Sequence, residues 1–305
     1  MPKEFSRFHP IISFLYFFSV IGFSMFLRNP VCIMTGFLSA TAYSFILNGK
    51  RAVKASISFL LPMMLLITII NPFFSHQGIT VLWYFKNGNA FTLEACVYGL
   101  FGAFLLAAVI QWFSCVHRIM TEEKVIYIFG RVFPAMSLVI SMVFRFVPRY
   151  RIQFQETLNA QKQLGKQGQE KNVITKMRNG IRMLSGMLTW ALEHAVETAQ
   201  SMKNRGYGLE KRTSYSIFHW EVRDTSMLIV ILVLTAGVIY AAYEGIFAWS
   251  CYPTFLGAFM NNYPGMTWKG WMWIAYVAYA ILTTLPILTD ISSYIYSGRI
   301  KRVIQ

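Results

Sequence analysis

Six long apolar stretches constrain what this chain can fold into. Each has about 17–26 residues, which is enough for a helix to cross the hydrocarbon core of a bilayer. Their approximate limits are residues 11–27, 31–47, 54–71, 92–117, 225–247 and 270–289. The composition agrees, because 55% of the residues are hydrophobic and only 13% are charged. We therefore predict an all-α, polytopic membrane protein with about six transmembrane helices.

The positions of Lys and Arg predict how these helices are oriented. If the N-terminus is inside, every cation except Arg28, Lys86 and Lys269 lies at or near the inner side. Lys and Arg are strongly biased towards cytoplasmic loops. We therefore expect a multi-pass protein of the cell membrane, with both termini in the cytoplasm and an outer loop at 72–91.

A basic block interrupts the apolar pattern. Residues 145–223 carry 14 of the chain's 28 Lys and Arg residues. Apolar side chains recur in this block at steps of three and four residues, which predicts two amphipathic helices. The first stripe contains Val147, Tyr150, Phe154 and Leu158, and the second contains Ile174, Met177, Ile181, Leu184, Leu188, Ala191, Ala195, Ala199 and Met202.

The apolar and basic segments together predict three regions. N-terminal transmembrane helices occupy residues 1–117, and C-terminal transmembrane helices occupy residues 225–305. Between them, residues 118–224 form a cytoplasmic or interfacial domain of long amphipathic helices.

The segment 125–144 is long enough to cross the membrane, but a single crossing would place the basic block outside. Gly130, Arg131 and Pro134 interrupt it. We expect a broken helix that packs against the other spans, in the interface or as a re-entrant segment. The alternative is a true span paired with a second crossing near 181–196, which carries Arg182, Glu193 and His194.

Several classes of site are not predicted. The cysteines Cys32, Cys96, Cys115 and Cys251 form no CxxC pair, and three of them lie in apolar runs, which favours small buried residues over metal ligands. His76 lies in the predicted outer loop, and Glu193-His194 is not part of an HExxH motif. The chain has no Walker A sequence or Gly-rich phosphate loop. We therefore expect no metal or cofactor, and any ATP would be hydrolysed by another chain.

Net charge is +15, which could suggest a nucleic-acid partner. The charge lies in the predicted inside loops, however, and no aromatic-interleaved basic platform of the single-strand-binding kind is present. We therefore expect the lipid bilayer, and no nucleic acid, as a partner.

The two amphipathic helices end in a similar way. The first ends at Lys162-Gln163-Leu164-Gly165 and the second at Lys203-Asn204-Arg205-Gly206. Glycine just past a helix end is the usual left-handed cap, and cations suit the negative end of the helix dipole.

These ends belong to a larger motif. It comprises Arg145-Phe146-Val147-Pro148, Glu156, Ala160-Gln161, Gly165 and Met202-Lys203-Asn204-Arg205-Gly206-Tyr207. A second region comprises Asn71-Pro72-Phe73-Phe74, Gly78, Val81-Leu82, Thr92-Leu93-Glu94-Ala95 and Tyr98-Gly99-Leu100. In combination, over roughly residues 50 to 235, the chain resembles the transmembrane T component of energy-coupling factor (ECF) transporters, a family that includes the membrane subunit of cobalt transporters. The family's two Ala-Arg-Gly motifs correspond to Asn204-Arg205-Gly206 and to Gln163-Leu164-Gly165, where leucine replaces the expected arginine.

The resemblance implies a coupling subunit of an ECF-type ABC importer that does not itself hydrolyse ATP. Its two motif ends would each dock on one ABC-type ATPase subunit, and a small membrane subunit that captures a vitamin or a metal ion would bind the apolar side of the helices. The docking residues would be Ala160, Gln163, Leu164, Gly165, Asn204, Arg205 and Gly206, and the capture-subunit residues would be Leu184, Leu188, Ala191 and Ala195.

A second hypothesis is an integral membrane enzyme with a cytoplasmic active site. It would need a convergent set of acids, bases or metal ligands, for which Glu156, Glu193, His194 and Glu197 are the candidates. A secondary transporter is disfavoured, because such carriers generally need charges buried at mid-membrane, and Glu94, Glu244 and Asp290 lie near predicted span ends.

Overall fold

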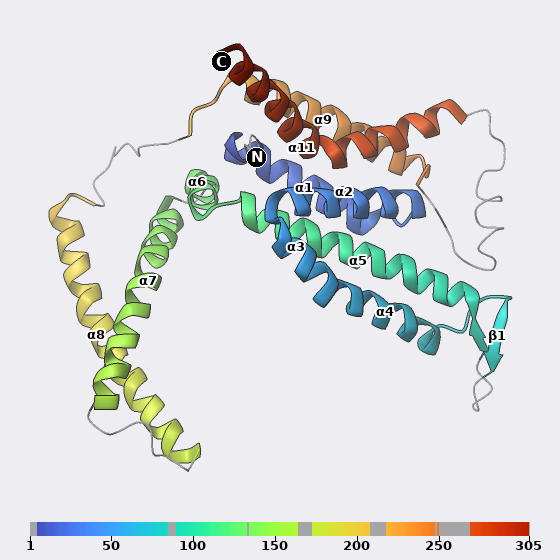
Figure 1. Cartoon of the computed structure of the whole chain (residues 1–305). Helices are drawn as coiled ribbons and strands as arrows, with labels where there is room; N and C mark the ends of the chain where they lie inside the picture. Colours follow the sequence, from blue (N-terminus) through green and yellow to red (C-terminus); the bar gives the residue numbers. More distant parts are fainter. Residues whose placement is uncertain are drawn as a thin grey trace. The chain divides into compact units, whose positions relative to one another are not determined.

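The computed structural model describes residues 5–84, 90–132, 134–163, 173–207, 218–247, 249 and 269–304. The chain divides into two compact units (Figure 1). We call the first the span unit; it contains residues up to Lys124 and from Phe218 onwards. The second, the helix-pair unit, runs from Val125 to Ile217.

The span unit is built from the predicted apolar helices. Its main elements are α1 (Pro10–Phe26), α2 (Pro30–Asn48), α3 (Lys50–Ala55), η2 (Ser56–Leu60), α4 (Leu61–Phe74), α5 (Leu93–Ile119), α9 (Val222–Tyr243) and α11 (Lys269–Ile304). Helices α3, η2 and α4 form one continuous rod, Lys50–Phe74. This rod, α2, α5, α9 and α11 are long and apolar enough to cross a membrane, whereas the apolar α1 has 17 residues. The predicted all-α, polytopic architecture is confirmed.

An aromatic cluster forms the core of the span unit. Trp112 of α5 is fully buried, and its ring centre lies 6.3 Å from each of those of Tyr16, Phe17 and Tyr43. Phe5, in the short helix η1 (Phe5–Arg7), is also fully buried and contacts Tyr16 edge-on. Large aromatic side chains fill such a core with few voids, which suits helix packing in lipid, where van der Waals contact is a main driving force.

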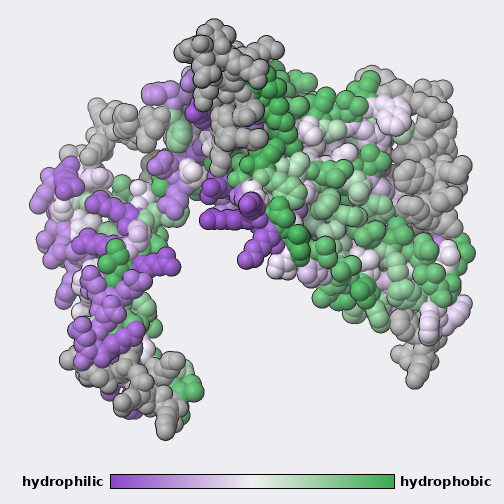
Figure 2. All heavy atoms as spheres, in the orientation of Figure 1, coloured by the Kyte–Doolittle hydropathy of each residue, from purple (hydrophilic) through white to green (hydrophobic). Residues whose placement is uncertain are grey.

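The outside of the span unit is also apolar. Figure 2 shows hydrophobic residues over much of its visible face. Phe18 of α1 is 74% exposed and Phe74 of α4 is 84% exposed. A soluble domain rarely leaves a continuous apolar surface open to water. A helix that is hydrophobic all round fits a lipid environment instead.

The N-terminal turn, residues 5–9, is tied to two later helices. The backbone N–H of Phe5 donates to Asp290 Oδ1 of α11 at 3.0 Å. The backbone N–H of His9 donates to Asp224 Oδ1 of α9 at 3.4 Å. Both carboxylates are buried. Buried carboxylates require such partners, because an unpaired buried charge is costly.

The same turn holds the beginning of α6 (Glu122–Val132). Lys124 Nζ donates to the backbone carbonyl of Ser6 at 2.7 Å. Burial lowers the pKa of the Lys124 amine, because the charged form loses hydration. The chain therefore leaves the span unit at a residue fixed to the N-terminal turn.

The segment predicted as an outer loop contains a hairpin that the sequence did not predict. Strand β1 (Val81–Tyr84) pairs antiparallel with β2 (Ala90–Thr92), with Val81 opposite Thr92 and Trp83 opposite Phe91. The register shifts between these two pairs. Strands this short carry little periodic signal.

Glu94, in the first turn of α5, holds the residues just before this hairpin in place. Its buried carboxylate accepts hydrogen bonds from the Thr80 backbone N–H and, at 2.6 Å, from the Thr80 hydroxyl. Gly78 has a φ of +132°, and a Cβ added there would lie 2.6 Å from Glu94 Oε2. The motif residues Gly78 and Glu94 therefore form one structural contact.

Gly99 allows α4 and α5 to approach closely. A Cβ added there would lie 2.7 Å from Asn71 Cβ and 3.3 Å from the Thr68 backbone. We expect Gly99→Ala to destabilise the fold by about 1–3 kcal/mol through overpacking. Gly102→Ala on the same helix is the control, because a Cβ there meets nothing within 4 Å. Thermal unfolding in detergent should show a lower midpoint for the first variant only, and equal midpoints would contradict the close contact.

The helix-pair unit contains α7 (Pro134–Gln163) and α8 (Val173–Asn204). The predicted break within 125–144 is confirmed, because α6 ends at Val132 and α7 begins at Pro134. Proline suits the first turn of a helix, where its missing N–H has no partner to lose. Among the described helices, neither α6, α7 nor α8 meets the length and hydropathy of a membrane span.

Helices α7 and α8 pack through aromatic and sulfur-containing side chains. The rings of Tyr150 and Trp190 meet edge-on at 5.5 Å, and Phe146 stacks on Tyr150. On α8, Met183 is buried, and Trp190 and His194 are half-buried. The face of α8 that carries these residues is therefore its packing face within the unit.

Candidate functional site

The predicted apolar stripe of α8 lies beside this packing face and remains largely open. Leu184 is 65% exposed and Leu188 is 63% exposed, while Ala195 is exposed and Ala191 half-buried. Contact with α7 therefore leaves most of the stripe exposed. An exposed apolar surface bordered by polar residues is characteristic of a protein or membrane contact.

The stripe continues into an apolar groove of about 640 Å³ between the two helices. Tyr150 and Phe154 of α7 form one wall, and Leu184, Leu188 and Ala191 of α8 contribute to the other. Three of the four predicted capture-subunit residues therefore line a single concave surface.

The C-terminus of α8 ends in a Schellman motif. Gly206 has a φ of +75°. Its N–H donates to the Lys203 carbonyl at 3.0 Å, and the Tyr207 N–H donates to the Met202 carbonyl at 3.1 Å. This pair of bonds satisfies carbonyls that the helix itself leaves without donors. The predicted glycine cap is confirmed, and it places Arg205 at the helix end.

We expect Gly206→Ala to loosen this end. An alanine in the left-handed conformation costs about 1–2 kcal/mol, which corresponds to roughly 5–30-fold faster local opening. Hydrogen exchange of the last-turn amides of α8 measures this opening. Gly186→Ala, within the same helix, is the control, because a Cβ there meets nothing within 4 Å and alanine favours a helix interior. Unchanged exchange in Gly206→Ala would contradict the role of the cap.

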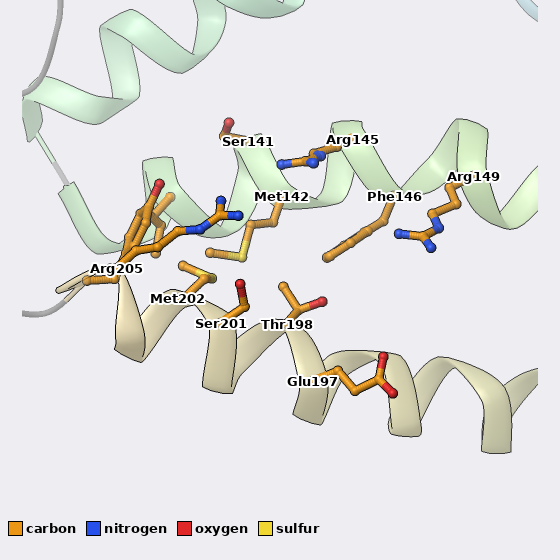
Figure 3. Close-up of a pocket in the computed structure, with 12 residues that line it drawn as sticks. Ser141, Met142, Arg145, Phe146, Arg149, Glu197, Thr198, Ser201, Met202 and Arg205 are labelled. Atoms are coloured by element: carbon orange, nitrogen blue, oxygen red, sulfur yellow. The ribbon is translucent and has the colours of Figure 1, made fainter.

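A second cavity, of about 590 Å³, lies next to Arg205 (Figure 3). Arg145 and Arg149 reach it from α7, and Arg205 reaches it from the end of α8. Glu197 is the acidic residue among its described lining residues. None of the three arginines forms an ion pair with another described residue. The cavity therefore offers guanidinium groups suited to the carboxylates of a partner.

The other predicted docking residues lie at helix ends. Ala160 and Gln163 are exposed in the last turn of α7, and Asn204 is exposed in the last turn of α8. None of these three lines either cavity. Leu164 and Gly165, which complete the first docking end, lie outside the described residues.

Two features of the site were missing from the sequence prediction. Arg145 was part of the motif and Arg149 directly follows it, but neither had an assigned role. Their spacing of four residues, which places both on one helix face, was the available signal. The packing face around Met183 and Trp190 was also missed, although its large side chains repeat with helical spacing.

The residues proposed for an enzyme do not converge on one site. His194 Nδ1 lies 3.1 Å from Glu197 Oε2, one helical turn along α8; His194 is half-buried and Glu197 is exposed. Glu193 and Glu156 are exposed on α8 and α7, respectively. Within the described ranges, no group of three or more His, Cys, Asp or Glu residues could hold a metal ion.

Comparison with known proteins agrees with the motif-based resemblance. No protein-family model matches the chain. It is 30% identical over 112 residues to the energy-coupling factor transporter transmembrane protein EcfT of Staphylococcus aureus, covering 36% of this chain and 42% of that protein. It is 37% identical over 99 residues to EcfT of Streptococcus thermophilus, covering 32% and 38%. These two matches therefore span less than half of each relative.

A longer match extends over most of both chains. The chain is 28% identical over 202 residues to EcfT of Lacticaseibacillus paracasei, covering 65% of this chain and 76% of that protein. Its helical, membrane-spanning architecture agrees with such a component. The predicted resemblance is thus confirmed, and this chain is a relative of the transmembrane EcfT components of energy-coupling factor transporters.

Proposed function

We propose that this chain is the energy-coupling subunit of an ECF-type ABC importer and hydrolyses no ATP itself. Two ABC-type ATPase chains would supply the energy, and a separate small membrane subunit would bind the transported vitamin or metal ion. One observation carries the proposal, namely that the α7–α8 pair presents two separate surfaces. One is an open apolar groove. The other is Arg205, which lies at the glycine-capped end of α8 and has no ion-pair partner among the described residues.

The two surfaces suit two different partners. The stripe at Leu184 and Leu188 is apolar and suits a helix of the capture subunit, because an amphipathic face binds a hydrophobic partner surface. The end at Arg205 is cationic and suits an acidic groove on an ATPase chain. In this proposal, both ends and the whole helix pair lie on the cytoplasmic side.

The proposed mechanism is mechanical. ATP-driven closure of the ATPase pair would move the docked ends of α7 and α8. Helices of 30 and 32 residues are stiff enough to carry such a movement as rigid bodies. The capture subunit bound to the stripe would then change its orientation in the membrane and release its cargo on the cytoplasmic side.

Purification of the tagged chain from its native membrane tests this function. Mild detergent should recover two ABC-type ATPase chains and a small membrane protein, identified by mass spectrometry. The complex should hydrolyse ATP, and the isolated chain should not. Recovery of the chain without any ATPase, from membranes in which it supports uptake, would contradict the proposal.

A further inference from the structure

A cavity of about 350 Å³ lies in the span unit and is lined by residues of α2, α3, η2 and α5. Arg51 of α3, together with His117 and Arg118 of α5, lines its polar end. No Asp or Glu is present among the described residues that line it. Arg51 and Arg118 form no ion pair with any other described residue. Two guanidinium groups therefore line a cavity that supplies no counter-charge.

Three other polar side chains at this cavity, those of Asn48, Gln111 and Ser114, have hydrogen-bond partners of their own. Asn48 Nδ2 donates to Ser114 Oγ at 3.3 Å. Thr41 Oγ1 donates to Gln111 Oε1 at 2.6 Å. The cations are thus the groups most available to a ligand.

The other end of the cavity is apolar. Phe59 and Leu60 of η2 and Ile110 of α5 line it. Ile110 and Arg118 are eight positions apart on one helix, a rise of about 12 Å. The lining therefore changes from apolar to cationic over roughly the depth at which a lipid changes from acyl chain to headgroup.

The wall between these ends contains an unusual turn. Residues Ser56–Leu60 are π-helical, within a rod that is otherwise α-helical. Turns of this kind are rare and frequently occur at functional sites. Ser56, Phe59 and Leu60 of this turn all line the cavity.

We propose that this cavity binds the phosphate headgroup of an anionic phospholipid of the inner leaflet. Basic pockets between transmembrane helices on the cytoplasmic side bind such headgroups. Arginine suits the task, because its planar fork of donors matches the oxygens of a phosphate. The apolar end selects a lipid over free phosphate, which has no acyl chain to place there. The site is independent of docking to ATPase chains or a capture subunit.

Lipid titration of the purified full-length chain tests the proposal. Phosphatidylglycerol or phosphatidylcholine is added in nonionic detergent, and bound lipid is counted by native mass spectrometry. Phosphatidylglycerol should bind in preference to phosphatidylcholine. Each cation near a lipid phosphate contributes about fivefold, so the Arg51→Gln/Arg118→Gln variant should bind phosphatidylglycerol about 25-fold more weakly.

Lys50→Gln/Lys54→Gln is the matched control. It removes the same total charge, with both changes on α3 beside Arg51, at positions that do not line the cavity. Its binding should equal that of the unmodified chain, and an equal loss in both variants would show surface charge alone and overturn the site.

Two further measurements separate the remaining outcomes. Ser56→Leu fills the cavity without changing charge, so it should also weaken phosphatidylglycerol binding, and normal binding would overturn the proposal. This variant keeps the test valid if loss of the arginines prevents folding. Inorganic phosphate should not displace bound phosphatidylglycerol, and efficient displacement would identify the ligand as free phosphate instead of a lipid.

Discussion

Arg205→Glu is expected to remove one ATPase chain from the purified complex. Arg205 is the terminal cation of α8 and has no ion-pair partner among the described residues. A hydrogen bond to a charged partner contributes about 1.5–3 kcal/mol. The substitution removes that bond and places two anions together, so affinity at this end should fall by more than about tenfold. Quantitative mass spectrometry of pull-downs would report the amount of each ATPase chain.

Arg182→Glu is the control for this experiment. It makes the same change in charge on the same helix, away from the end of α8. It should leave both ATPase chains in place. Arg205→Lys should give intermediate recovery, because lysine keeps the charge but not the two-pronged donor.

The two docking ends should respond differently to salt. At the Arg205 end, ATPase binding should weaken as ionic strength rises, because salt screens the ion pair that Arg205 would form there. Leu164 offers only apolar contact, so Leu164→Glu should weaken the other end with less dependence on ionic strength. Full recovery of both ATPase chains with Arg205→Glu would end the docking hypothesis.

Leu188→Glu is expected to release the capture subunit while the chain itself still folds. Leu188 is 63% exposed in the helix-pair unit, so a charge there costs little in the isolated chain. In a packed seam with a partner helix, an unpaired charge costs on the order of several kcal/mol. Recovery of the capture subunit should therefore fall below detection, and Ala195→Glu should act in the same direction.

The neighbouring residue provides a control. Thr189 is exposed on the polar face of α8, outside the predicted stripe. Thr189→Glu should leave both the capture subunit and uptake unchanged. If Leu188→Glu also assembled and transported normally, the stripe would not be an interface.

The sequence predicted the spans well because the bilayer imposes a simple rule. A helix that must satisfy its own backbone in lipid shows as one long apolar run. The break before Pro134 and the cap at Gly206 were predicted for similarly local reasons, since proline and glycine act through their own backbone geometry.

What the sequence could not predict depends on contacts between distant residues. Helix α8 carries two periodic faces, one with Leu184 and Leu188 and one with Met183 and Trp190. Only the ring contact between Trp190 and Tyr150 shows which face packs on α7 and which stays open. The arginine cavity likewise requires the pairing of Arg145 with the end of a helix that begins 28 residues later, at Val173.

The ties of the N-terminal turn have a mechanical consequence. Lys124 and Asp224 lie on either side of the helix-pair unit in the chain, and both bond to this one turn. These two residues of the span unit are therefore held to one turn, and they cannot separate while both bonds hold. The fully buried ring of Phe5, in the same turn, belongs to the aromatic core around Trp112, so the turn links both of these chain segments to that core.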